Sequence, residues 1–255
     1  MNIVIPMAGA GSRFAKAGYV DPKPLIKVHG VPMVKLVINN LKPSRPHKFI
    51  FIVQRAHDEK YHLTAQLKHW EPTCEVIYTD GLTEGAACTV LLAKDLINNN
   101  EHLMIANSDQ FVDCSIDDYI AEMEKHDYDG IIMTMKADDP KWSFVGFNEN
   151  GKVNKVVEKE VISDEATVGI YNFKKGADFV RVANEMIIKN DRVNNEYYVA
   201  PSYNYLINEG ADIGIFNVGS EANGMYGLGI PSDLDLFLKL ELSHKATQGI
   251  EYGNN

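Results

Sequence analysis

The chain has 255 residues, 45% of them hydrophobic, and a formal net charge of −10 at pH 7. This length allows one large α/β domain or two small ones with a sizeable core, and the acidic balance disfavours a nucleic-acid backbone as a partner. No stretch is long and apolar enough to cross a membrane. Residues 1–3 open directly on an apolar run without a signal peptide, so we expect no membrane association.

The cysteines point to a compartment. Cys74, Cys88 and Cys114 are odd in number and lack metal-ligand spacing. Buried thiols of this kind are typical of a reducing environment, so we predict a cytoplasmic protein.

Strand-like and helix-like segments alternate through the first half of the chain. Short apolar runs predict buried strands at 3–5, 49–53, 75–78 and 102–106. Helical spacing predicts helices at 34–41, at 58–70 with Asp58 as the cap, and at 85–97. Repeated strand–helix pairs predict a parallel sheet with helices on both faces, in which ligands bind at the carboxyl ends of the strands.

The second half predicts a mixed sheet. An Asn-Gly turn within 148–152 indicates a hairpin whose arms are 143–147 and 153–157. Further strands are expected at 130–135, 166–173 and 212–218, and helices at 177–188, before 207 and at 232–242. The tail 247–255 is predicted to be loose. No Pro/Gly/Ser linker separates the halves, so a single domain over 1–255 is expected, with lobes of about 1–110 and 111–245.

The loop after the first strand is the most informative stretch. It reads Met-Ala-Gly-Ala-Gly-Ser-Arg-Phe, and its small residues leave room for a ligand. Gly9 and Gly11 can adopt positive φ, which lets successive backbone N–H groups face one concavity that binds anions. Arg13 adds a planar cation suited to phosphate oxygens, and Lys23 follows between two stiffening prolines. We interpret the stretch as a triphosphate cradle.

Other interpretations of this loop fit less well. A dinucleotide-binding turn needs a third glycine where Phe14 stands, and a P-loop needs Gly-Lys-Ser/Thr. A tight surface turn with a solvated arginine would suit an isolated Gly-x-Gly. The Arg-Phe pair and the following Pro-Lys-Pro-Leu favour the cradle instead.

These motifs resemble those of a known family. The segment Gly9–Phe14, followed by Pro-Lys-Pro-Leu-Ile-Lys-Val-His-Gly-Val-Pro-Met at 22–33, resembles the opening of the sugar-phosphate nucleotidyltransferases, and the similarity continues almost to the C-terminus. Overall the sequence is most similar to the branch found in capsule and surface-polysaccharide loci. The resemblance implies a Rossmann-like, glycosyltransferase-A-like α/β fold with a mainly parallel sheet and a mixed extension. It makes 1–110 the nucleotide-binding lobe and 111–245 the acceptor-binding lobe.

The resemblance also implies a reaction, in which a nucleoside monophosphate passes from a nucleoside triphosphate to a phosphorylated small molecule and pyrophosphate leaves. Arg13, Lys23 and Asp109 match the catalytic residues. Asp109 lies in Asn-Ser-Asp-Gln after the fourth strand and would hold Mg²⁺, although alone it would suit a turn or a cap equally well. The residues implied to bind the nucleotide are Ala8, Gly9, Ala10, Gly11, Ser12, Arg13, Lys23, Gly85 and Ala86. Small residues at 85 and 86 also suit close helix packing.

On the acceptor side, the matching residues are Glu158, Lys159, Gly169, Asn195 and Glu196. The carboxylates fit hydroxyls or an ammonium, and the lysine fits a phosphate. Trp142, Tyr171 and Tyr198 are candidates for the pocket wall, with core packing as the alternative. Overall similarity favours CTP as donor and phosphoglutamine or a sugar 1-phosphate as acceptor, and homo-oligomerisation stays open.

One segment departs from the family pattern. Many members carry a second metal-binding Asp in Asp-x-Gly-Thr-Pro near the C-terminus, and here Gly227 takes its place in Gly-Leu-Gly-Ile-Pro. Metal binding would then depend on Asp109 with phosphate oxygens or on another carboxylate, with Asp233 and Glu196 as candidates.

Two alternatives to the enzyme assignment stay open. One is a nucleotide-sugar-binding or glycosyl-transferring protein of the same architecture, which usually shows Asp-x-Asp where this chain has Phe111 and has no use for the Arg13/Lys23 cradle. The other is a degenerate, regulatory member, which the intact Arg13, Lys23 and Asp109 disfavour.

Overall fold

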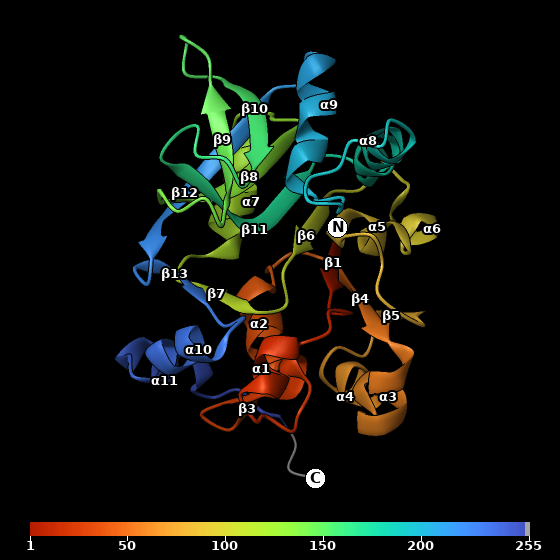
Figure 1. Ribbon diagram of the computed structural model, residues 1–255, viewed down its shortest axis with the longest axis vertical. Coiled ribbons are helices and arrows are strands. Elements are labelled where there is room, and N and C mark those ends of the chain that lie inside the picture. The colour runs from red at the N-terminus through yellow and green to blue at the C-terminus, as the bar shows by residue number, and fades with distance from the viewer. Residues whose placement is uncertain (253–255) are drawn as a thin grey trace.

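The computed structural model describes residues 1–252. Their main feature is an 11-stranded sheet with the path β5-β4-β1-β6-β11-β8-β12-β13-β7, to which β9 and β10 are added beside β11 (Figure 1). Four strands of the first half run parallel to one another. They are β1 (Asn2–Pro6), β4 (Lys48–Gln54), β5 (Glu75–Thr79) and β6 (Leu103–Ala106). The parallel sheet predicted from the alternating pattern is confirmed.

The second half of the chain extends this sheet with mixed pairing. β11 runs antiparallel to both β6 and β8, whereas β8 and β12 are parallel. The strands are β7 (Gln110–Val112), β8 (Gly130–Lys136), β11 (Glu165–Phe173), β12 (Ile213–Glu221) and β13 (Gly224–Gly227). β9 (Ser143–Phe147) and β10 (Val153–Glu158) form the hairpin that the Asn-Gly turn predicts. The predicted fold class, including the mixed extension, is confirmed.

Alternation along the strands separates two hydrophobic cores. Ile3 and Ile5 of β1 lie in one core, whereas Val4 between them lies in the other, because successive side chains of a strand point to opposite faces. The first core is covered by α2 (Met33–Leu41), α4 (Leu63–Trp70) and α7 (Ile116–Lys125). The second is covered by α5 (Ala86–Leu91), α8 (Gly176–Ile188) and α9 (Tyr203–Asn208). Helices therefore cover both faces, as predicted.

The helix predicted over 58–70 is two helices, α3 (Arg55–Tyr61) and α4, which meet at His62 with φ 51°. Asp58 lies inside α3 and does not cap it. Its carboxylate accepts hydrogen bonds from the backbone N–H of Thr64 at 2.6 Å and from the Tyr78 hydroxyl at 2.9 Å. Burial opposes ionisation of Asp58, but these two donors hold its pKa below the ordinary value. The predicted cap thus serves the following helix.

Two further predicted helices are also divided. The segment 85–97 forms α5 and α6 (Lys94–Ile97), and 232–242 forms α10 (Pro231–Leu238) and the start of α11 (Glu241–Thr247). The run ending at 207 is a 3₁₀ turn, η2 (Ala200–Ser202), followed by α9. Elements without a sequence-based prediction are α1 (Ser12–Lys16), η1 (Lys23–Leu25), β2 (Lys27–Val28), β3 (Val31–Pro32), α7, β7 and β13. Of the predicted loose tail, residue 247 closes α11 and 253–255 lie outside the described residues.

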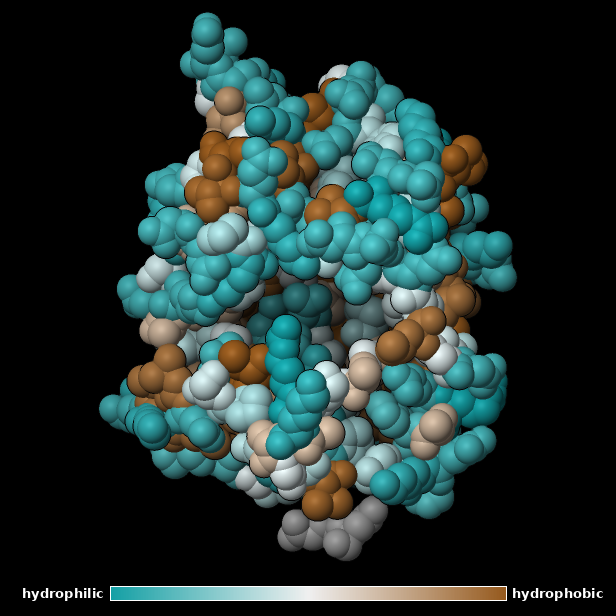
Figure 2. All heavy atoms as spheres, in the orientation of Figure 1, coloured by the Kyte–Doolittle hydropathy of each residue, from teal (hydrophilic) through white to brown (hydrophobic). Residues whose placement is uncertain are grey.

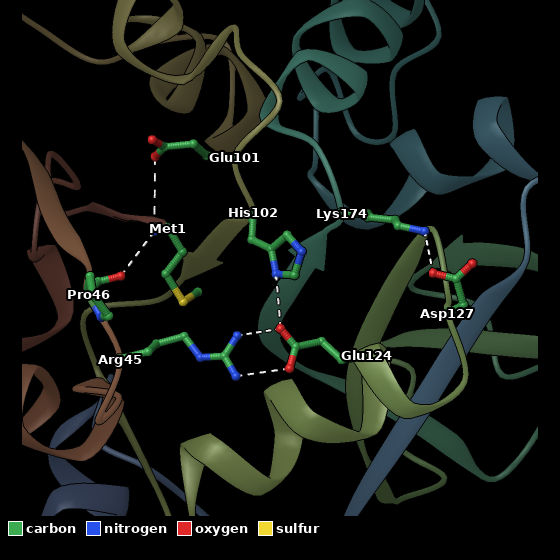
Figure 3. A network of polar contacts seen from close by, with 8 residues as sticks. All are labelled: Met1, Arg45, Pro46, Glu101, His102, Glu124, Asp127 and Lys174. Carbon is green, nitrogen blue, oxygen red and sulfur yellow. Dashed lines mark hydrogen bonds and ion pairs between the residues drawn. The ribbon is translucent and has the colours of Figure 1, made fainter.

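Polar contacts tie together the segments at the amino ends of the parallel strands (Figure 3). The Met1 amino group donates to the Pro46 carbonyl at 3.1 Å, and Arg45 forms a two-fold ion pair with Glu124 of α7. The hydrogen bond from Arg45 holds the pKa of Glu124 below its ordinary value. Structural contacts therefore occupy the amino ends of the parallel strands. We expect a site at their carboxyl ends instead.

None of the helices in residues 1–252 has both the length and the apolar character needed to span a bilayer.

Candidate functional site

Two adjoining cavities lie at the carboxyl ends of β1 and β6. One has a volume of about 330 Å³ and contains the loop after β1, and we call it the cradle cavity. The other has a volume of about 250 Å³ and is lined by β9, β10 and β11, and we call it the aromatic cavity. Pro6, Ala86 and Asn107 line both. Figure 2 shows the surface hollowed between the upper and lower parts of this view, in agreement with a site at this edge of the sheet.

A larger cavity of about 820 Å³ lies elsewhere, between the β2–β3 hairpin and α4. Tyr61, Trp70 and Tyr252 are among its lining residues. It contains none of the residues that the sequence predicts for the site, so its size alone does not make it the functional centre.

A side chain from the neighbouring strand holds the backbone of the cradle loop. The side-chain amide of Gln54, at the end of β4, donates to the Ala8 carbonyl at 2.6 Å. Gly11 precedes α1 and has the positive φ, 60°, that the sequence predicts for it. Gly9 does not have a positive φ, contrary to the prediction. A Cβ on Gly9 would meet no atom within 4 Å, so its lack of a side chain leaves cavity space free. Ala10 and Ser12 are also exposed in this part of the loop.

Arg13 lies on α1 with an exposed side chain and is not among the residues lining the cradle cavity. The next residue, Phe14, is only 1% exposed and packs in a third hydrophobic cluster with Phe111 and Phe237. The buried phenylalanine therefore fixes α1, while the guanidinium beside it stays accessible to a ligand.

Lys23 and Asp109 are brought into direct contact. The Lys23 ammonium donates to Asp109 Oδ2 at 2.7 Å, and the two side chains are 22% and 23% exposed. A Cβ on Gly229 would lie 2.6 Å from the same Oδ2, so the glycine leaves room for the carboxylate. Both residues line the cradle cavity. The sequence predicts that both belong to the site, but 86 residues separate them and no pattern predicts their contact.

Gly85 lines the cradle cavity. Its φ is 126°, and a Cβ there would lie 2.5 Å from the backbone N and O of Tyr197. On either side of it, the Tyr197 N–H donates to the Glu84 carbonyl at 2.8 Å, and the Ala87 N–H donates to the Tyr197 carbonyl at 3.0 Å. Only glycine allows this approach, which holds the 193–198 segment against the wall of the cradle cavity.

Asn195 and Glu196 belong to a tight turn. Val193 and Glu196 exchange backbone hydrogen bonds of 3.0 and 2.9 Å, and Asn194 and Asn195 between them have φ 50° and 64°. Two positive φ values are typical of a type I′ turn, which favours asparagine. Both predicted residues are exposed, and neither lines the cradle cavity or the aromatic cavity. The turn therefore explains the asparagine at position 195 without any contact to a ligand.

Glu158 is the buried carboxylate of the aromatic cavity. It is 9% exposed, and the Ser143 hydroxyl donates a hydrogen bond to it. Burial raises the pKa of Glu158, and the nearby Lys159 charge only partly offsets this. Around it the lining includes Lys141, Trp142, Thr167, Gly169, Tyr171 and Tyr198. A donor group on a ligand would satisfy the carboxylate.

Lys159 points to the rim. It has φ 59°, and its ammonium donates to the Tyr198 hydroxyl at 2.8 Å. This hydrogen bond raises the pKa of Lys159. Lys159 is exposed and is absent from the lining of the cavity, so it can meet an anion at the entrance.

Gly169 acts through its neighbour Asn107. Gly169 has φ 80°, and a Cβ there would lie only 2.0 Å from Asn107 Nδ2, so the glycine leaves room for the Asn107 side chain. The Gly169 carbonyl also accepts a hydrogen bond from the Asn107 N–H at 3.1 Å. Asn107 lines both cavities and was not predicted, although its position directly after β6 was a usable signal. Other unpredicted lining residues are Thr83, Thr89, Ser108, Ser143 and Thr167.

The carboxylate of Asp233 lies beside the departure at Gly227. Its Oδ2 is 3.2 Å from the position of a Cβ on Gly227. Burial raises the pKa of Asp233 and Glu221 adds to the rise, while Lys141 and Arg13 partly offset it. Within residues 1–252, no three His, Cys, Asp or Glu side chains are grouped to hold a metal ion. A metal on Asp109 would therefore need further oxygen ligands from substrate phosphates or water.

Comparison with known proteins places these features in context. The model of the nucleotidyl transferase family matches residues 3–200. The crystal structure of a nucleoside-diphosphate-sugar pyrophosphorylase from Vibrio cholerae RC9 is similar with a TM-score of 0.79 and 27% identity, covering 93% of this chain and 100% of that one.

Two curated relatives carry different specificities. The catalytic subunit beta of mannose-1-phosphate guanylyltransferase from Dictyostelium discoideum is 26% identical over 183 residues, 68% of this chain and 49% of the relative. The 2-aminoethylphosphonate cytidylyltransferase from Lancefieldella rimae is 31% identical over 114 residues, 40% of this chain and 46% of the relative. The matches thus span about half the length of these curated relatives.

Proposed function

Because this chain belongs to the nucleotidyl transferase family, we propose that it transfers a nucleoside monophosphate from a nucleoside triphosphate to a phosphorylated small molecule, with release of pyrophosphate. The observation that carries the proposal is the shared wall of the two cavities, formed by Pro6, Ala86 and Asn107. A triphosphate in the cradle cavity and an acceptor in the aromatic cavity would meet at this wall.

The donor side supplies positive charge and N–H donors. The backbone of 9–12 and Arg13 would hold the β- and γ-phosphates, and Lys23 would neutralise charge on the α-phosphate as an acceptor oxygen attacks it. The acceptor phosphate is ionised at neutral pH, so the protein needs no strong general base. Positioning and charge neutralisation then account for catalysis.

The residues present fit a magnesium ion at Asp109. The carboxylate borders the cradle cavity, and the triphosphate would bring the remaining oxygen ligands. A bound ion would supply charge neutralisation and would align the reacting phosphates. In its absence, Lys23 is the partner of this carboxylate.

The acceptor side combines one buried carboxylate with a cationic rim. Glu158 would accept hydrogen bonds from hydroxyls or an ammonium, Lys159 would bind the phosphate, and Gly169 would keep Asn107 in place between the substrates. Asn195 and Glu196 would act from the exposed turn next to Tyr197, where the Glu196 charge contributes to the raised pKa of Lys159.

For the substrates, we propose CTP as donor and phosphoglutamine or a sugar 1-phosphate as acceptor, in the formation of a capsule or surface-polysaccharide precursor. The relative named as a cytidylyltransferase for a non-sugar phosphonate supports this choice, although the one named as a guanylyltransferase acts on a sugar phosphate. A purine would also need more room than cytosine beside Gly85 and Ala86, which line the cradle cavity.

The test is a matrix of four nucleoside triphosphates against phosphoglutamine and several sugar 1-phosphates, followed by pyrophosphate release. We expect CTP to exceed the other donors at least tenfold in kcat/KM, because a site that hydrogen-bonds one base edge leaves buried groups unpaired with another. A tenfold preference for another donor would contradict the CTP assignment. Transfer of a glycosyl group from a nucleotide sugar, without pyrophosphate release from any pair, would overturn the reaction class.

A further inference from the structure

We propose that Lys23 closes Asp109 to metal ions until a triphosphate draws its ammonium away, so that metal and triphosphate are bound as coupled ligands. The inference rests on the proposed function, because it takes Lys23 as the phosphate-binding cation and Asp109 as the metal ligand.

The contact itself is the first step of the argument. The Lys23 ammonium lies 2.7 Å from Asp109 Oδ2, which is ordinary for a charge-assisted hydrogen bond. The same oxygen lies close to Gly229, where a Cβ would be only 2.6 Å away. A metal ion that binds Oδ2 therefore competes with the ammonium in a crowded position.

The surroundings strengthen the pair. Both side chains are less than a quarter exposed, so solvent screens their attraction less than that of a surface pair. A dication and an ammonium compete for one carboxylate, and within residues 1–252 no cluster of three metal-ligating side chains adds affinity for the dication.

The geometry of Lys23 lets a triphosphate resolve this competition. Its backbone lies in the 3₁₀ turn η1 between Pro22 and Pro24, whereas its side chain has a flexible stem. The ammonium can therefore turn from Asp109 to a phosphate while the loop stays in place. Both residues line the same cavity, so the ligand that attracts the ammonium lies where the metal is needed.

Linkage then fixes the consequence. If a triphosphate frees Asp109 and strengthens metal binding by some factor, metal on Asp109 strengthens triphosphate binding by the same factor. The free protein keeps its metal site neutralised, and the site becomes available only when substrate is present.

The direct test measures Mn²⁺ binding to the nucleotide-free protein by electron paramagnetic resonance. We expect Lys23→Met to bind Mn²⁺ at least tenfold more tightly than wild type, and Lys23→Gln to behave alike. Lys23→Arg keeps the charge and should stay within twofold of wild type. Asp109→Asn combined with Lys23→Met should lose the gain.

Arg13→Met is the matched control, because it removes a cation from the same cradle without breaking the Lys23–Asp109 contact. We expect less than a twofold gain in Mn²⁺ affinity. Equal gains in Arg13→Met and Lys23→Met would overturn the proposal in favour of general charge repulsion, and an unchanged Mn²⁺ affinity in both Lys23→Met and Lys23→Gln would overturn it outright. These measurements contain no nucleotide, so their failure is distinct from a failure to release pyrophosphate in the substrate matrix.

Discussion

The cradle cavity and the aromatic cavity share a wall but handle charge in opposite ways. In the first, Lys23 and Asp109 are partly exposed and neutralise each other at 2.7 Å. In the second, Glu158 is buried, and burial raises its pKa even though the Ser143 hydroxyl donates a hydrogen bond to it. The cradle cavity therefore contains an ion pair, whereas the aromatic cavity contains a desolvated carboxylate.

The difference follows from how each cavity is built. The cradle cavity is made of loops at the ends of parallel strands, where backbone N–H groups and flexible charged side chains are available. Many of the side chains that line the aromatic cavity come from β9, β10 and β11 of the antiparallel extension. A polyanion suits the first cavity, and a neutral or cationic acceptor body suits the second. Substitutions of single residues in each cavity can test this difference.

The largest effect is expected at Asp109. Asp109→Asn keeps the shape of the side chain but removes the ligand charge, and loss of metal-ion stabilisation worth several kcal/mol lowers turnover by about 10³-fold or more. The measurement is kcat as a function of Mg²⁺ concentration. A metal dependence equal to that of wild type would show that Asp109 has only a structural role in its turn.

Arg13→Ala comes next. Loss of one preorganised charge contact to the transition state costs about 3 kcal/mol, or about 10²-fold in kcat/KM. The exposed side chain predicts an unchanged melting temperature. Lys16→Ala, which removes an exposed cation from the same helix, is the control and should keep full activity. Normal kcat/KM in Arg13→Ala would remove Arg13 from the cradle.

Two glycines that line the cradle cavity separate a structural from a functional requirement. Gly85→Ala forces positive φ on alanine and places its Cβ against the Tyr197 backbone, so we expect a loss of about 1–3 kcal/mol in the free energy of unfolding. Gly9→Ala meets no atom and should keep its stability while raising the KM for the nucleotide. Denaturant unfolding and steady-state kinetics measure both. Equal stability losses in the two variants would contradict the claim that the close approach of Tyr197 requires a glycine at position 85.

The smallest change in rate is expected at Glu158. Glu158→Gln keeps the contact with Ser143 but replaces a charged acceptor, so we predict about a tenfold loss in kcat/KM for the phosphorylated acceptor, equivalent to about 1.4 kcal/mol. The KM for the nucleoside triphosphate should not change. A selective rise in the nucleotide KM would place Glu158 on the donor side instead.

The same variant has a stability signature. Because the folded-state pKa of Glu158 lies above its ordinary value of 4.5, the folded protein binds this proton more tightly than the unfolded chain. Stability therefore falls as pH rises from about the ordinary value through the folded pKa. Glu158→Gln should remove this loss and be more stable than wild type at pH 7. A melting temperature below that of wild type at pH 7, and equal to it at pH 4, would contradict burial as the dominant effect.

The sequence by itself determined the parts of the protein that depend on neighbours along the chain. Periodicity predicted most of the buried strands and the Asn-Gly turn predicted the β9–β10 hairpin, because each depends on local backbone freedom and burial. The Gly-x-Gly-Ser-Arg-Phe and Pro-Lys-Pro-Leu motifs predict a cradle, and Gly9, Lys23 and Pro24 of these motifs line the cavity after β1. Helix breaks at His62 and between α10 and α11 were missed, since the direction of the next helix depends on the core it must cover.

Only the tertiary structure decided which distant residues meet. The Lys23–Asp109 pair, the fit of Gly85 to Tyr197 and the position of Asn107 against Gly169 each join segments at least 60 residues apart. The strand order brings them together, and a linear pattern of residue types carries no information about that order. The same reason explains why Asn195, predicted for the site from its motif, lies in a turn whose two positive φ values already account for an asparagine.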